Sequence, residues 1–169
     1  MYLFVTRLIR FFFLALVLLG AVRAPFDWSE DATWELSQGK ATFRLGLAWP
    51  EVADLPAEQE MVVLPIGLLV RRQANRVVNL TVLQGEWSLL RNSQPLGRVG
   101  DSLEQWQNQL GLPKARYGNP EKMGIIQYYQ ASLADVGLMV SQEQVQSVML
   151  VEPGYLVPAL ERTGYSVLP

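Results

Sequence analysis

Three arginines form the most distinct cluster of charge in the chain. Arg71 and Arg72 begin, and Arg76 ends, a polar stretch (RRQANR) that is typical of a turn between two apolar runs. Guanidinium groups bind carboxylates and phosphates through paired N–H donors. These residues could therefore hold an anion or an acidic partner. The alternative is an ordinary solvated turn, in which exposed charges contribute little.

Acidic side chains gather in residues 50–60 (PEVADLPAEQE). The four acids are Glu51, Asp54, Glu58 and Glu60. Calcium takes about six to eight oxygen ligands, but the spacing matches no calcium loop, and Pro50 and Pro56 favour an exposed linker. Two carboxylates about 5–10 Å apart across a cleft could hydrolyse a glycoside. The sequence does not single out such a pair.

Tryptophans are the third group with a possible binding role, because their rings could form a platform for a sugar. They are Trp28, Trp34, Trp49, Trp87 and Trp106. Trp49 and Trp106 fall on the apolar faces of their predicted elements, where core packing explains them. Trp28 is the one that we expect to be exposed, so it joins the arginines as a candidate binding residue.

Composition excludes several classes of chemistry. The chain has no histidine and no cysteine, which removes the Ser–His–Asp and Cys–His nucleophiles and histidine-ligated metal sites. We therefore expect no catalytic residue, no metal and no cofactor. Without residues 1–24 the 14 basic residues fall to 11 against 16 acids, a net charge of about −5. An acidic domain without a basic stripe is not expected to bind nucleic acid.

Residues 1–24 have the pattern of a secretory signal. Arg7 and Arg10 precede an apolar run over residues 11–22, and small residues follow it. Pro25 would follow a cut after Ala24 and obstruct it, although a cut after Ala21 is possible. The segment is therefore a cleaved signal, a short anchor that meets the membrane through residues 8–22, or a buried core helix. The missing cysteine excludes a lipid anchor. We expect the rest of the protein to be exported, periplasmic or extracellular.

Residues 25–169 are predicted to form a single α+β domain, an antiparallel sheet packed by one or two short helices. Residues 25–96 are mostly β. A hairpin through Ser37–Lys40 joins Trp34–Leu36 to the alternating run Thr42–Trp49. Met61–Val70 is predicted as one buried strand with a bulge. The remaining strands of this part are predicted at Val77–Leu83 and Trp87–Leu90.

Residues 97–151 are predicted as a helix followed by a β-meander. Leu103, Trp106 and Leu110 share one face of the helix, Asp101 caps it with Glu104 closing a capping box, and Gly111 ends it. The strands are expected at Ile125–Leu133, Gly137–Val140 and Val145–Val151, and the last two form a hairpin. Residues 152–169 are expected to hold a short helix over Tyr155–Arg162 and then an extended segment.

The layout of residues 97–151 resembles that of a known module. Its pieces are Gly97–Ser102 (GRVGDS), Leu110–Pro113 (LGLP), Tyr128–Tyr129 and Gly137–Val140 (GLMV). This order is similar to the helix-then-meander module of the small outer-membrane assembly lipoproteins (the SmpA/OmlA family), which β-lactamase inhibitor proteins share. The resemblance implies a fold fragment and a tendency to bind other proteins. The chain departs from the family in lacking the acylated cysteine.

These observations predict a non-enzymatic binding or assembly module of the bacterial cell envelope, with another protein as its partner. Two alternatives stay open. One is a membrane-anchored accessory subunit of a larger complex, in which residues 11–22 are the functional part. The other is a carboxylate-based hydrolase of cell-wall glycans.

Overall fold

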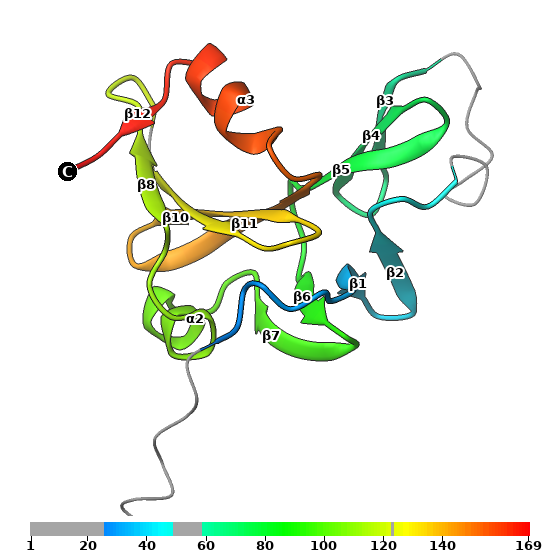
Figure 1. Ribbon diagram of the computed structural model, residues 1–169, viewed down its shortest axis with the longest axis horizontal. Coiled ribbons are helices and arrows are strands. Elements are labelled where there is room, and N and C mark those ends of the chain that lie inside the picture. The colour runs from blue at the N-terminus through cyan, green and yellow to red at the C-terminus, as the bar shows by residue number, and fades with distance from the viewer. Residues whose placement is uncertain (1–25, 49–58, 123) are drawn as a thin grey trace, which may run out of the picture.

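A computed structural model describes the protein over residues 26–48, 59–122 and 124–169, and its strands form two antiparallel sheets (Figure 1). The smaller sheet has the order β2-β1-β6-β7. Its strands are β1 (Trp34–Gln38), β2 (Ala41–Arg44), β6 (Ser88–Arg91) and β7 (Gln94–Arg98). The predicted β1–β2 hairpin is confirmed, since Gln38 pairs with Ala41.

The larger sheet has eight strands in the order β12-β8-β9-β10-β11-β5-β4-β3. They are β3 (Met61–Leu64), β4 (Leu68–Gln73), β5 (Arg76–Val82), β8 (Ala115–Gly118), β9 (Ile125–Gln130), β10 (Asp135–Ser141), β11 (Gln144–Val151) and β12 (Ser166–Val167). The helices are α2 (Leu103–Leu110) and α3 (Leu156–Arg162). The predicted antiparallel α+β domain with short helices is thus confirmed, while the predicted signal lies outside the described residues.

Two-residue turns close three of the hairpins. Both central residues have a left-handed φ in Ala74–Asn75, Asn92–Ser93 and Gln142–Glu143, which is the type I′ geometry whose twist matches that of paired strands. The predicted polar turn over Arg71–Arg76 is therefore too long. Arg71 and Arg72 belong to β4, and only Ala74 and Asn75 form the turn.

Met61–Val70 is a hairpin and not the single bulged strand that we predicted. The chain reverses at Pro65–Gly67, where Gly67 has a φ of +79° and no space for a Cβ atom beside Gln84. The expected strand Thr42–Trp49 is also shorter, since β2 ends at Arg44 and Ala48 only bridges to Arg76. Strands β7 and β8 were missed. Pro95 is tolerated in β7 because that strand is an edge of the smaller sheet.

The N-cap of helix α2 lies one residue later in the chain than predicted. Ser102 is the N-cap, and its side chain and that of Gln105 form the reciprocal capping box. The Asp101 carboxylate instead accepts a hydrogen bond from the Arg98 backbone N–H. The predicted end at Gly111 is confirmed. Trp106 packs directly on Gly97, where a Cβ atom would lie 2.6 Å from the indole ring.

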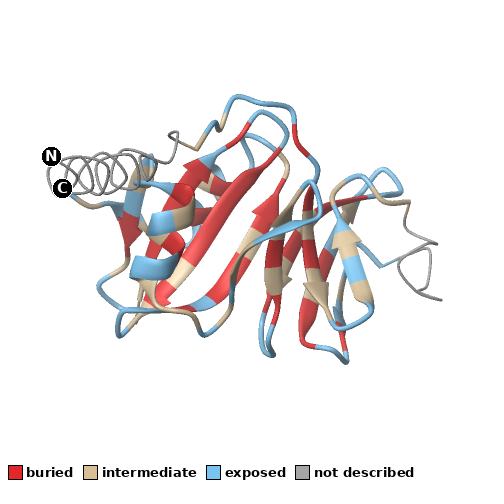
Figure 2. Cartoon of the chain, turned by 90° about the horizontal axis from the view of Figure 1, so that it is seen from below, coloured by how far each residue is buried: buried red, intermediate tan, exposed pale blue. Residues whose placement is uncertain are grey.

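One large core joins the two sheets. Figure 2 shows buried residues along the strands of both. Leu36 and Leu89 of the smaller sheet, Trp106 of α2, and Leu138 and Leu150 of the larger sheet belong to this core. A second, smaller cluster lies on the opposite face of the larger sheet, where Leu156 and Leu160 of α3 pack on strands β8 to β11. We call this opposite face the outer face.

Candidate binding surface

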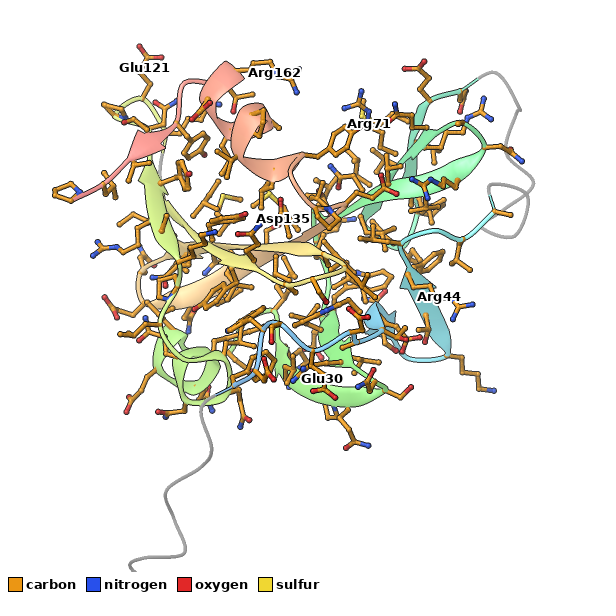
Figure 3. The ribbon with its side chains drawn as sticks, in the orientation of Figure 1. Glu30, Arg44, Arg71, Glu121, Asp135 and Arg162 are labelled. Carbon is orange, nitrogen blue, oxygen red and sulfur yellow. The ribbon has the colours of Figure 1, made fainter. Side chains whose placement is uncertain are left out.

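The sequence candidates Arg71 and Arg72 lie beside a third arginine that the sequence did not connect with them. Arg162 ends α3, and together with Arg71 and Arg72 it lines a hollow of about 420 Å³ between α3 and the β4–β5 hairpin. Figure 3 shows Arg71 and Arg162 at the two sides of this hollow. We call it the arginine notch. Glu60, Gln73, Ala74, Asn75 and Tyr155 complete its lining.

The arginine notch is rich in arginine on a chain whose net charge is negative. Among the described residues, the guanidinium groups of Arg71, Arg72 and Arg162 and the carboxylate of Glu60 line it, whereas the whole chain has a formal charge of −2. Within the described residues, Arg71 makes no ion pair. Arg162 donates from Nε to the Pro158 carbonyl oxygen at 3.2 Å. The exposed guanidinium groups of Arg71 and Arg162, which line the same hollow, favour a bound anion.

The other two sequence candidates have partners in the protein. Arg76 forms an ion pair with Glu152 at 2.8 Å, so it contributes little free charge. Arg72 is half-buried and donates from Nε to the Gln59 carbonyl oxygen at 2.7 Å, which fixes its side chain at the wall of the notch. The Tyr155 hydroxyl donates to Gln73 Oε1 at 3.1 Å and links the start of α3 to β4.

Strand β3 is an edge of the larger sheet, and within residues 26–48, 59–122 and 124–169 it pairs with β4 alone. The Glu60 carbonyl oxygen accepts from the Arg72 N–H at 2.8 Å. Because an antiparallel ladder alternates, Val62 and Leu64 also direct their backbone groups toward β4. Met61 and Val63 therefore direct theirs toward the open edge.

The side chains of Met61 and Val63 lie on the outer face beside this edge. They are 57% and 55% exposed, whereas Leu64 is buried in the core. Leu69 and Arg71 of β4 pair with Val63 and Met61 respectively, so the exposed apolar surface of β3 continues to the arginine notch. Most soluble proteins protect such an edge with charges, proline or a covering segment. Within β3 itself there is neither a charge nor a proline.

The described tryptophans are mainly core residues. Trp34, Trp87 and Trp106 are buried, and Trp49 lies outside the described residues. Trp28 is half-buried: its ring stacks between Trp34 and Tyr129, and its indole N–H donates to the Leu110 carbonyl oxygen at 3.1 Å. Part of it lines an open hollow of about 230 Å³ with Leu112 and Lys114. These rings form no extended platform among the described residues.

Asp135 is the one fully buried acid among the described residues. Its carboxylate accepts from the Tyr128 hydroxyl at 3.0 Å and from the Gly154 N–H at 2.8 Å. Burial raises the pKa of Asp135, and the hydrogen bonds from Gly154 and Tyr128 oppose that rise. Because both oxygens are engaged inside the protein, this carboxylate joins β10 to the start of α3 and faces no hollow described above.

The described residues bring together no group of three acids that could hold a metal ion. Of the acids considered for calcium, only Glu60 is described, and it lies at the arginine notch. The described part of the chain also has no helix that is long and apolar enough to cross a membrane. Comparisons with family models, with curated proteins and with solved structures find no match to this chain.

The sequence alone could not show this surface. Arg162 is about 90 residues from Arg71 in the chain, and only the packing of α3 on the sheet brings them together. The signal for β3 was present, because Pro65 and Gly67 mark the reversal and leave Met61 and Val63 alternating with buried residues. The uniformly apolar composition of Met61–Val70 made this reversal hard to distinguish from a bulge within one strand.

Proposed function

We propose that the protein is an exported, non-enzymatic binding module of the bacterial cell envelope, and that it captures another protein by adding an extended segment of that protein to β3. The open edge of β3, with exposed Met61 and Val63 side chains, carries the proposal. Main-chain hydrogen bonds give such β-addition its affinity, and contacts to alternate side chains give it specificity. The likeness of residues 97–151 to the outer-membrane assembly lipoproteins is in keeping with this role.

The edge can be closed by one substitution. Val63 directs its N–H away from β4, so Val63→Pro removes an outward donor without removing a hydrogen bond of the β3–β4 ladder. Val63→Thr is the matched control, because it keeps the N–H, the β-branched shape and the strand preference. Both variants should retain the circular-dichroism spectrum of the wild type.

The measurement is capture of a partner from gently solubilised envelopes by the tagged full chain, with the captured proteins identified by mass spectrometry. We expect a protein that is retained by the wild type and by Val63→Thr and lost with Val63→Pro. Equal capture by all three would exclude edge addition. Sedimentation of the purified protein provides the second readout: a homodimer that dissociates in Val63→Pro would show that a second copy occupies β3, and the proposal of a different partner would be wrong.

A further inference from the structure

We infer that the arginine notch binds a carboxylate of the same extended segment, so that the partner carries acidic residues directly after the part that pairs with β3. This inference rests on the proposed edge addition for the position of the partner. It goes further by naming the partner's chemistry and its direction along the edge. Three observations carry it: the register of β3, the place of the notch at one end of that strand, and the two exposed guanidinium groups there, Arg71 and Arg162.

The register places the notch at the beginning of β3. Met61 pairs with Arg71, and the Arg72 N–H donates to the Glu60 carbonyl oxygen. The opposite end of β3 turns back at Pro65–Gly67, away from the arginines. A segment on the open edge would therefore have one of its ends beside Arg71 and Arg72 and the other beside the hairpin turn.

The direction of the segment follows from the sheet. Every described strand pair is antiparallel, and antiparallel pairing is slightly more stable per residue than parallel pairing. An antiparallel segment would enter beside Leu64, pass Val63 and Met61, and leave beside Glu60. The residues that follow it in the partner's chain would thus arrive at the notch.

The charge of the notch selects what can bind there. Arg71 and Arg162 are exposed guanidinium groups on the two elements that border the notch, and within the described residues neither of them forms an ion pair. The Tyr155 hydroxyl and the Gln73 amide, which are hydrogen-bonded to each other, supply polar groups at the same hollow. A carboxylate matches this lining because a guanidinium can bind both of its oxygens at once. An apolar or basic continuation of the partner would offer Arg71 and Arg162 no carboxylate.

The test uses three synthetic peptides with the full-length chain, each with a fluorescent label and a blocked carboxyl terminus. One has a Thr-Val-Thr-Val-Thr core followed by two glutamates. The second carries the glutamates before the core, and the third replaces them with glutamines. We expect the first peptide to bind about three- to tenfold more tightly than the other two in fluorescence anisotropy, the range for a few exposed charge pairs. The preference should decrease as salt is added.

Arg71→Gln and Arg162→Gln should each reduce this preference, and the double variant should abolish it. Arg44→Gln is the matched control, since Arg44 is an exposed strand arginine of the smaller sheet, far from the notch (Figure 3). The inference would be overturned if the three peptides bind equally or if none of them binds. It would also be overturned if the Arg44 and Arg71 substitutions have equal effects. A preference for the peptide with leading glutamates would overturn the antiparallel direction.

Two further readouts separate this inference from the proposed function. Val63→Pro should weaken the binding of all three peptides to the same extent. If Val63→Pro has no effect while the preference for the acidic peptide persists, the arginine notch binds carboxylates but edge addition is wrong. If Val63→Pro weakens binding but the acidic peptide is not preferred, edge addition is supported and the inference about the notch is wrong. Vesicles containing phosphatidylglycerol provide the last comparison. Binding to them that requires Arg71 and Arg162, without peptide binding, would assign the notch to an anionic membrane and overturn the peptide inference.

Discussion

At the scale of single residues, Asp135 shows how a carboxylate can be structural. It is fully buried, and it accepts hydrogen bonds from Tyr128 of β9 and from Gly154, just before α3. Tyr128 and Asp135 affect each other, since burial and the neighbouring carboxylate raise the pKa of the Tyr128 hydroxyl. The Tyr128 hydroxyl therefore keeps its proton at physiological pH and can donate the hydrogen bond to Asp135.

Replacing Asp135 by Ala should destabilise the protein. The change leaves the buried Tyr128 hydroxyl and the Gly154 N–H without their acceptor, and a buried group that loses its partner costs about 1–3 kcal/mol. We expect the free energy of unfolding in urea to fall by about 2–4 kcal/mol. Tyr128→Phe removes only one of these hydrogen bonds and should cost less. A loss below that of Tyr128→Phe would show that Asp135 does not hold α3 on the sheet.

The pH dependence of Asp135 follows from its raised pKa. The native state binds this proton more tightly than the unfolded chain, whose aspartates titrate near about 3.9. The stability that the protonated form contributes is thus fully present below that value and is lost as pH rises through the native pKa. The side chain that Asp135→Asn introduces cannot ionise. The difference in free energy of unfolding between this variant and the more stable wild type should therefore shrink from acidic to neutral pH. Urea titrations across this range measure it, and a deficit that grows with pH would contradict the direction of the shift.

At the scale of elements, α2 depends on its capping residue more than on the adjacent acid. The Ser102 hydroxyl accepts from the Gln105 N–H at 3.3 Å, and Gln105 Oε1 accepts from the Ser102 N–H at 3.0 Å. These bonds satisfy N–H groups that a helix start leaves without partners. The helix has only eight residues, so its stability relies on this cap and on the burial of Trp106 and Leu110.

Substitutions at the helix start can distinguish the observed cap from the one that the sequence predicted. Ser102→Ala should lower the free energy of unfolding by about 1 kcal/mol. Glu104→Gln, at the position first assigned to the capping box, should cost only a few tenths of a kcal/mol, because its charge merely favours the helix start. Thermal and urea unfolding measure both. A larger loss with Glu104→Gln would favour the predicted cap.

At the scale of the whole molecule, the two sheets depend on one core. Leu36 and Leu89 of the smaller sheet and Leu138 and Leu150 of the larger sheet belong to the same cluster of buried residues. The segment after β2 also crosses between the sheets, since the Val77 N–H donates to the Leu47 carbonyl oxygen at 2.9 Å. Neither sheet can lose its partner without exposing this core to water.

The protein should therefore unfold in a single cooperative transition. Far-UV circular dichroism reports the strands of both sheets, and tryptophan fluorescence reports the shared core, where Trp34, Trp87 and Trp106 are buried. We expect the two signals to follow the same urea curve. Two separated transitions would mean that the sheets are independent units.

Local signals allowed much of the fold to be predicted from the sequence. Gly111 and Pro113 define the end of α2, the apolar Trp34 and Leu36 indicate β1, and the polar residues Ser141–Gln144 indicate the β10–β11 hairpin. These predictions hold because neighbouring residues dictate them through helix capping and side-chain alternation. The sequence does not distinguish two structures that share one composition. Met61–Val70 is apolar throughout, which predicts a single bulged strand, whereas the structure has a hairpin that reverses at Pro65–Gly67.

The sequence by itself determined the chemical types available to a site: arginines without histidine or cysteine, and an acidic chain overall. Only the tertiary structure decided which of them meet. It paired Arg76 with Glu152, brought Arg162 to the hollow that Arg71 and Arg72 line, and placed β3 at the edge of the larger sheet as far as the described residues extend. The physical reason is that local preferences act over a few residues, whereas a binding surface depends on which distant segments the burial of the core brings side by side.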